Sequence, residues 1–221
     1  MDVRDAIRAR VSVKDFTDAE VPRETIERLL EDAILAPNHR MTQPLHFRVL
    51  GPAAKGAYAA VLARRKTAKM DDQAAAEAVR EKMVRRTVSV PAMVGVVVTL
   101  AEDPETREED WATAFMAIQN LSLAAVERGL GSHIKTGAVM EEPELRAALE
   151  VVAGERLAAI VFIGEPAEVL ARALPALDQL LPGARDRIAE ARLVRIPAGG
   201  FIPYPGYFTR LAGYDEAARE S

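Results

Sequence analysis

The stretch that decides the fold reads APNHRMTQPLHF, at residues 36–47. Pro37 ends a preceding amphipathic helix pattern, because proline lacks an amide proton and disfavours helical geometry in the residue before it. Pro44 then directs the chain into an apolar, extended run at residues 45–50. A short connection between two rigid elements is where chains often present hydrogen-bonding groups to a ligand, although a polar connector without function is the alternative. The polar side chains between the prolines are Asn38, His39, Arg40, Thr42 and Gln43.

Two further polar stretches favour the ligand interpretation. The first reads RVSVKDF at residues 10–16, and the second reads SHIKTG at residues 132–137. Arg10, Ser12 and Lys14 occupy alternate positions, so in an extended backbone their side chains share one face. Two cations and a hydroxyl group on one face suit a phosphate or another dense anion. A surface strand of alternating polarity is the plainer interpretation of the same residues.

The composition is that of an ordinary globular protein. The chain has 221 residues, of which 49% are hydrophobic and 28% charged, so it fits one large domain with ample material for a core. A net charge of −4 argues against general nucleic-acid binding. The absence of cysteine excludes disulfides, thiol nucleophiles and cysteine-ligated metals. The N-terminus lacks the apolar core of a signal peptide, and no apolar run approaches the roughly 20 residues of a membrane span. We therefore expect a cytoplasmic protein.

Hydrophobic periodicity predicts alternating helices and strands. The run at residues 92–100 shows little alternation and predicts a strand buried on both faces. The helix pattern at 111–128 is apolar nearly all round, which places it inside the protein or in a dimer interface. We expect residues 101–107 to form a charged loop. The other predicted elements are helices at 3–10, 22–35 and 141–150, a helical region from 53 to 86 broken in two within 64–73, and strands at 47–50 and 157–164.

The chain beyond residue 166 reads as an extension of a single domain. Helical patches are predicted at 174–181 and 185–191. The stretch at 196–214 is rich in proline, glycine and aromatic residues, and it predicts an ordered arm that lies over a surface. We therefore divide the chain into a domain at residues 1–166 and a C-terminal extension at residues 167–221.

Several common motifs are excluded by the sequence. Residues 129–136 resemble a nucleotide-binding P-loop only faintly, because Ile134 stands where that motif requires glycine. The sequence contains neither a dinucleotide-binding Gly-x-Gly-x-x-Gly after a strand nor a Gly-x-Ser-x-Gly nucleophile motif. His39, His46 and His133 show no metal-ligand spacing, so no metal site is predicted.

Four patterns taken in order resemble the nitroreductase-like flavoprotein family. They are the arginine–serine–lysine motif at residues 10–16, the Ala-Pro…Gln-Pro motif at 36–47, the glycine-rich helix end and basic strand at 129–137, and the closing strand with Gly-x-Pro at 160–166. The resemblance covers about residues 2–166. It implies an α+β, nitroreductase-like fold in which helices flank a central mixed β-sheet. It also implies an intertwined homodimer with FMN at the subunit interface and the C-terminal arm packed on the partner subunit.

The resemblance assigns roles to residues of each polar stretch. Arg10, Ser12 and Lys14 would hold the phosphate and the pyrimidine side of FMN, and the charge of Lys14 would stabilise the anionic reduced flavin. His39 would donate a hydrogen bond or, equally, pack as a structural residue in the interface. The remaining cofactor-binding residues implied by the resemblance are Val11 in the first motif, Asn38 and Gln43 with His39 in a loop given by the partner subunit, and Lys135, Thr136 and Gly137.

The implied activity is that of an FMN-dependent NAD(P)H oxidoreductase. NADH or NADPH would supply a hydride, and a nitroaromatic, quinone or related small acceptor would then take the electrons by ping-pong transfer. Val11 replaces a second arginine of the family pattern, and Leu45 and Ile134 stand where tryptophan is common. The substrate preference therefore does not carry over. Two alternatives stay open: a flavoenzyme of the same fold that performs dehalogenation, flavin cleavage or ring oxidation, or a flavin-binding module without turnover.

Overall fold

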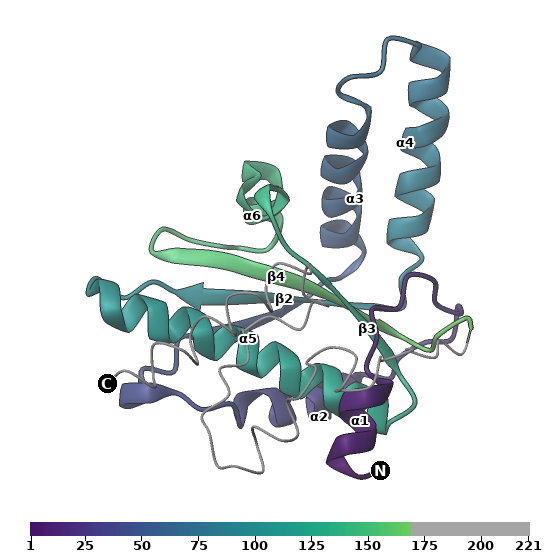
Figure 1. The fold of residues 1–221 in the computed structure, drawn as a ribbon. Coiled ribbons are helices and arrows are strands. Elements are labelled where there is room, and N and C mark those ends of the chain that lie inside the picture. Colours follow the sequence, from purple (N-terminus) through teal and green to yellow (C-terminus); the bar gives the residue numbers. More distant parts are fainter. Residues whose placement is uncertain (169–221) are drawn as a thin grey trace, which may run out of the picture. The chain divides into compact units, whose positions relative to one another are not determined.

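The computed structural model describes residues 1–168, which form a four-stranded sheet between two layers of helices (Figure 1). The strand order is β1-β2-β4-β3, so β1 and β3 are the edge strands. The strands are β1 Leu45–Val49, β2 Ala92–Thr99, β3 Gly131–Lys135 and β4 Glu155–Gly164. The helices are α1 Val3–Ala9, α2 Arg23–Ile34, α3 Pro52–Thr67, α4 Gln73–Val88, α5 Pro104–Glu127 and α6 Pro143–Ala148, with short 3₁₀ helices η1 His39–Met41 and η2 Ala138–Glu141.

The α+β fold expected from the sequence is confirmed, but the neighbouring strands of the described sheet are antiparallel rather than mixed. The connection between β1 and β2 explains the first of these pairings. The α3–α4 pair runs away from the sheet and back, so β2 starts near the end of β1 and runs in the opposite direction (Figure 1). Among residues 1–168, parallel pairing is confined to an isolated bridge between Ser12 and Ser132.

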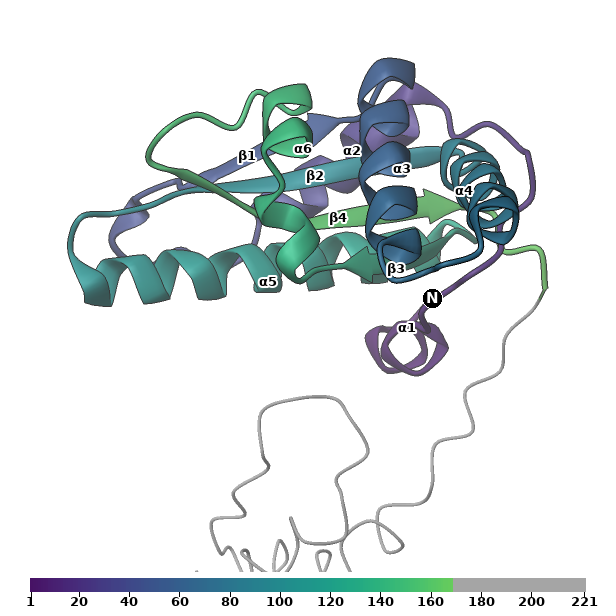
Figure 2. The ribbon, with the colours of Figure 1, turned by 90° about the horizontal axis from the view of Figure 1, so that it is seen from above.

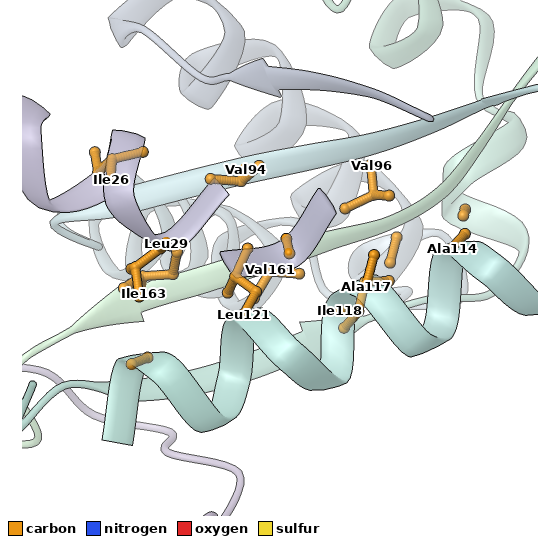
Figure 3. Close-up of a cluster of buried hydrophobic side chains, with 14 of the residues drawn as sticks. Ile26, Leu29, Val94, Val96, Ala114, Ala117, Ile118, Leu121, Val161 and Ile163 are labelled. Carbon is orange, nitrogen blue, oxygen red and sulfur yellow. The ribbon is translucent and has the colours of Figure 1, made fainter. Parts of the chain in front are cut away.

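One face of the sheet packs against α2 and α5. Alternate residues of β2, including Val94 and Val96, meet Leu29 of α2 and Leu121 of α5 (Figure 3). These side chains are almost completely removed from solvent. Each fully buried aliphatic side chain stabilises the fold by about 1.5–3 kcal/mol, so this layer holds α5 firmly along the sheet.

The opposite face of the sheet packs against α3 and α6. Met93 and Val97 of β2 point to this side, where they meet the buried ring of Tyr58 from α3. Figure 2 views the molecule from this side and shows α3 and α6 over the strands. Because successive side chains of β2 enter different cores, the prediction of a strand buried on both faces is confirmed.

The expected helices and strands are present, with corrections at some ends. The predicted loop at 101–107 is wrong beyond Asp103, because α5 begins at Pro104. Asp103 caps the helix by accepting a hydrogen bond from the Thr106 amide, and proline is favoured in the first turn. The helix expected at 141–150 is shorter, since η2 precedes it. The predicted break of the 53–86 region is confirmed by the turn between Thr67 and Gln73.

Among the helices of residues 1–168, none combines the length and the hydropathy needed to cross a membrane. The helical patches predicted at 174–181 and 185–191 and the arm predicted at 196–214 lie outside the described residues.

Candidate functional site

The first polar stretch lies against the edge strand β3. Ser12 bridges to Ser132, and the Val13 amide donates a 3.0 Å hydrogen bond to the Ser132 carbonyl oxygen. Val13 is buried, whereas Ser12 and Lys14 are exposed, so the predicted alternation is confirmed over residues 12–14, while Arg10 and Val11 are both half-buried. Arg10 is the C-terminal cap of α1, and its amide donates to the Ala6 carbonyl.

Gly131 allows this close approach. A Cβ atom at position 131 would clash with the Val13 side chain and would lie 3.1 Å from Cγ of Pro166. The glycine therefore lets the segment that carries Ser12 and Lys14 lie directly on β3.

Three cations gather where this segment meets β3 and the end of α4. Arg86 donates hydrogen bonds to the Lys14 carbonyl oxygen at 3.3 Å and to the Asp15 carboxylate at 2.6 Å. Lys135 is half-buried, with its ammonium 5.5 Å from the centre of the Phe162 ring. The structure thus brings Lys14, Lys135 and Arg86 together, and we call these three residues the cation group. Thr136 and Gly137 follow β3 directly and are exposed.

The positive charges of the cation group act on one another. Burial lowers the pKa of Lys135, and the charges of Arg86 and Lys14 lower this pKa further. His133 sits among the same charges. Burial lowers the pKa of His133 first, and Lys135 lowers it next, against the opposing effect of the hydrogen bond to Val13. Like charges held this close repel one another, so a bound anion would stabilise the arrangement.

His133 joins β3 to the N-terminal segment. Its Nδ1 atom lies 2.9 Å from the Val13 carbonyl oxygen, which can only accept, so Nδ1–H is the donor. In the neutral imidazole this leaves Nε2 as a hydrogen-bond acceptor. The ring also packs near Phe162, with 6.2 Å between the ring centres.

The lowered pKa of His133 predicts a pH dependence of stability. As the pH falls through about 6.5, the unfolded chain takes up a proton on His133 and the folded chain does not. The contribution of neutral His133 is therefore present above pH 6.5 and lost below it. We expect His133→Asn, which keeps a donor for Val13, to lose less melting temperature than the wild type between pH 7.5 and 5.5. His46→Asn, on β1 at the other edge of the sheet, is the control; equal pH slopes for His133→Asn and the wild type would contradict the assignment.

The loop of the second polar stretch is held by α5. His39 Nδ1 lies 2.7 Å from a Glu109 carboxylate oxygen, and Thr42 donates to Asp110. Thr113 donates a 3.1 Å hydrogen bond to the Pro37 carbonyl oxygen. These contacts attach the loop to the N-terminal half of α5.

Asn38 shapes the loop from within. Its amide nitrogen donates to the Thr42 hydroxyl group at 2.9 Å, and its amide oxygen accepts from the Gln43 amide at 2.7 Å. Arg40, Met41 and Gln43 have positive φ angles of 63°, 54° and 49°. Residues other than glycine rarely adopt this left-handed conformation, so three of them within four positions are uncommon and often mark a functional loop.

The loop and the cation group do not meet within one chain. The loop lies at the end of the sheet where Thr99 pairs with Glu155, because the Thr99 amide donates a hydrogen bond to the Pro44 carbonyl oxygen. A row here means the residues that lie opposite one another across the strands. The N-terminal segment adjoins Ser132, which pairs with Ile163 at the other end of β4. Eight residues of β4 separate these two rows, or about 26 Å at 3.3 Å per residue. Lys135 of the cation group pairs with Ile160, five residues or about 16 Å from the row of Glu155. The structure therefore brings together the first and third polar stretches and keeps the second apart.

Arg86 is the functional candidate that sequence reasoning missed. The pair Arg85-Arg86 reads as part of a solvated helix face, and nothing in the spacing links Arg86 to Asp15, 71 residues earlier. As for metals, residues 1–168 contain no group of three or more His, Asp or Glu side chains that could hold an ion.

The profile of the Nitroreductase family matches residues 7–165. The chain belongs to the nitroreductase family. It is 31% identical over 193 residues to the "Putative NAD(P)H nitroreductase YfhC" of Bacillus subtilis, covering 85% of this chain and 93% of that protein. It is 26% identical over 167 residues to the "Putative NAD(P)H nitroreductase YdjA" of Escherichia coli K12, covering 75% and 89% of the two chains.

Solved structures of nitroreductases share the fold. A nitroreductase-like family protein from Bacillus cereus superposes with a TM-score of 0.69 at 26% identity, covering 90% of this chain and 97% of the other. The FMN- and NADPH-dependent nitroreductase NfnB from Sphigopyxis sp. strain HMH superposes with a TM-score of 0.63 at 21% identity, covering 82% and 98%. The predicted nitroreductase-like fold is therefore confirmed.

Proposed function

We propose that this nitroreductase-family protein is an FMN-dependent NAD(P)H oxidoreductase that reduces nitroaromatic, quinone or related small acceptors. The observation that carries the proposal is the convergence of Lys14, Arg86 and Lys135 beside the edge strand β3. The Asp15 carboxylate is already paired with Arg86. No carboxylate of residues 1–168 shifts the pKa of Lys135 or His133, so the positive charge of the cation group is not neutralised from within the described chain. The family membership and the names of the relatives support the same proposal.

The residues present fit FMN, which combines a phosphate dianion with a polar ring system. Lys135 and Arg10 would hold the phosphate, while Lys14 and Arg86 would face the pyrimidine side. Neutral His133 offers an acceptor at Nε2, on the same face of β3 as Lys135. This combination of cations and a neutral acceptor matches a ligand that is anionic and also carries hydrogen-bond donors.

FMN supplies the hydride-transfer chemistry when it is bound, and the protein supplies orientation and charge. Lys14 and Arg86 hold positive charge beside the site before any reactant arrives, so no reorganisation is needed as negative charge develops. Lys135 does the same from a half-buried position, where its charge is screened less by water. We further propose that the exposed face of the flavin takes one planar reactant at a time. The nicotinamide would then leave before the acceptor enters, which predicts ping-pong kinetics with parallel double-reciprocal lines.

We also propose a homodimer, in which the loop of a second copy completes the site. The separation between Asn38, His39 and Gln43 and the cation group supports this, because a two-fold axis can bring opposite ends of two chains together. Large apolar side chains also remain exposed on the layer that carries the loop, as expected for an obligate interface. They are Ile34, Leu35, Met41, Phe115 and Met116.

A single substitution tests the dimer. Met116→Glu on α5 should give a monomer that has lost its flavin, because a buried unpaired charge in an interface costs several kcal/mol. Light scattering and the flavin absorbance spectrum measure both effects. Val152→Glu changes an exposed apolar residue near α6 and should leave both unchanged. A wild-type monomer with intact flavin would refute the dimer.

The function itself is tested on purified protein. Cofactor released by denaturation should have the mass of FMN, and anaerobic mixing with NADH or NADPH should bleach the flavin absorbance. A bleached enzyme should recover its colour on addition of a nitroaromatic or a quinone. If FMN is present but neither nicotinamide bleaches it, the reductase proposal fails, and a family member with other chemistry or a flavin-binding module becomes the better account.

A further inference from the structure

A basic hollow lies directly beside the cation group. It is formed by the C-terminal half of α4 and the chain at Asp15, and it opens to solvent. Arg86 belongs to both places, since it lines the hollow and also donates to the Lys14 carbonyl oxygen. The lining residues are Asp15, Lys82, Arg85, Arg86 and Ser89.

The charges of the hollow are not balanced from within. Asp15 supplies the carboxylate of the hollow, and this carboxylate already forms an ion pair with the Arg86 guanidinium at 2.6 Å. Arg85 pairs with Glu81 at 3.3 Å on the same helix, with 71% of the arginine side chain exposed, and such surface pairs contribute little. Lys82 makes no ion pair or hydrogen bond with any described residue. The hollow therefore has an excess of positive charge and at least two donors, on Lys82 and Arg85, that an incoming anion can reach.

Other basic side chains on the same helix pair are matched more closely by carboxylates. Arg64 of α3 contacts both Glu142 and Glu144, and Arg65 contacts Glu142. Arg80 of α4 contacts Glu77 and also donates to Thr67. A solvated helix face would explain the basic residues of the hollow individually. Lys66, near the far end of α3, also makes no ion pair with a described residue, so the hollow is distinguished by its place beside the candidate flavin site, where Lys82 and Arg85 adjoin Arg86.

We propose that the hollow binds the 2′-phosphate of NADPH, so that the enzyme prefers NADPH to NADH. The inference rests on the proposed function, in which a nicotinamide dinucleotide must reach the flavin beside Lys14. Because the hollow shares Arg86 with the place where the nicotinamide would lie, the rest of the dinucleotide can extend over the hollow. A monoester phosphate carries close to two negative charges and three acceptor oxygens, which suits Arg85 and Lys82, and arginine is a common partner of the NADP 2′-phosphate.

Direct binding tests the hollow without turnover. Calorimetry on FMN-loaded protein should find adenosine 2′,5′-bisphosphate bound about tenfold more tightly than adenosine 5′-monophosphate, the effect of about one charge-assisted hydrogen bond at an exposed site. Arg85→Gln and Lys82→Gln should each remove most of this difference. Arg28→Gln is the matched control, because it removes another exposed arginine with an i,i+4 glutamate partner, this one from α2. It should leave the difference intact.

Kinetics give a second readout. The KM for NADPH should rise about tenfold in Arg85→Gln, while kcat and the KM for NADH stay at wild-type values. Added salt should weaken the binding of NADPH more than the binding of NADH in the wild type. Equal affinities for the two adenosine nucleotides, or a preference that survives both Arg85→Gln and Lys82→Gln, would overturn the inference. These outcomes differ from a failure of the proposed function, in which FMN is missing or no nicotinamide bleaches it.

Discussion

Replacing Arg86 by alanine should weaken FMN binding about ten- to a hundredfold. Arg86 is one of three cations that converge beside β3, and it also fixes the chain at Lys14 and Asp15 through two hydrogen bonds. A hydrogen bond to a charged group contributes about 1.5–3 kcal/mol, and about 1.4 kcal/mol is a tenfold change in affinity. Titration of the apoprotein with FMN, followed by flavin fluorescence, measures the loss.

The neighbouring residue provides the control for Arg86. Arg85→Ala removes the same charge and the same side chain one position earlier on α4, but Arg85 contacts Glu81 rather than the N-terminal segment. FMN affinity should therefore stay within about twofold of the wild type. Equal losses in the two variants would mean that FMN responds to the net charge of α4, and the specific role assigned to Arg86 would be wrong.

Gly131→Ala should both destabilise the protein and reduce its FMN content. The added methyl group must displace Val13, and with it the segment that carries Ser12 and Lys14. Inserting a methyl group into such a close contact typically costs about 1–3 kcal/mol, which is a large share of the stability of a small domain. Urea denaturation measures the free energy of unfolding, and the ratio of flavin to protein absorbance measures cofactor content.

Gly56→Ala is the matched control for this substitution. Gly56 lies inside α3, where an added Cβ meets no atom within 4 Å. Alanine is favoured over glycine in a helix interior by about 0.5–1 kcal/mol, so this variant should be slightly more stable and keep its FMN. If Gly131→Ala were as stable as Gly56→Ala and kept its flavin, then the contact between Val13 and β3 would not position the site.

Much of the fold was predictable because its signals are local. The two prolines of residues 36–47 mark the end of one helix and the start of β1, and the unbroken apolar run of β2 indicates burial on both faces. The start of α5 was missed because charged residues suggested a loop, although Asp103 and Pro104 are the cap and first-turn residues of a helix. The antiparallel pairing was also missed, since strand direction depends on where α3 and α4 return the chain.

The features of the candidate site also separate into those with local sequence signals and those that depend on long-range packing. Residue identity and spacing alone predicted that Ser12 and Lys14 share an exposed face, because backbone geometry sets which neighbours share a face. The strand that ends at Lys135 was implied by the family resemblance. Only the tertiary structure brought Arg86 to Lys14 and separated the loop of His39 from both. Those relations join residues far apart in the chain, and they depend on how helices and strands pack rather than on any local pattern. The sequence by itself therefore indicated which residues to expect at a binding site, and packing decided which of them lie together.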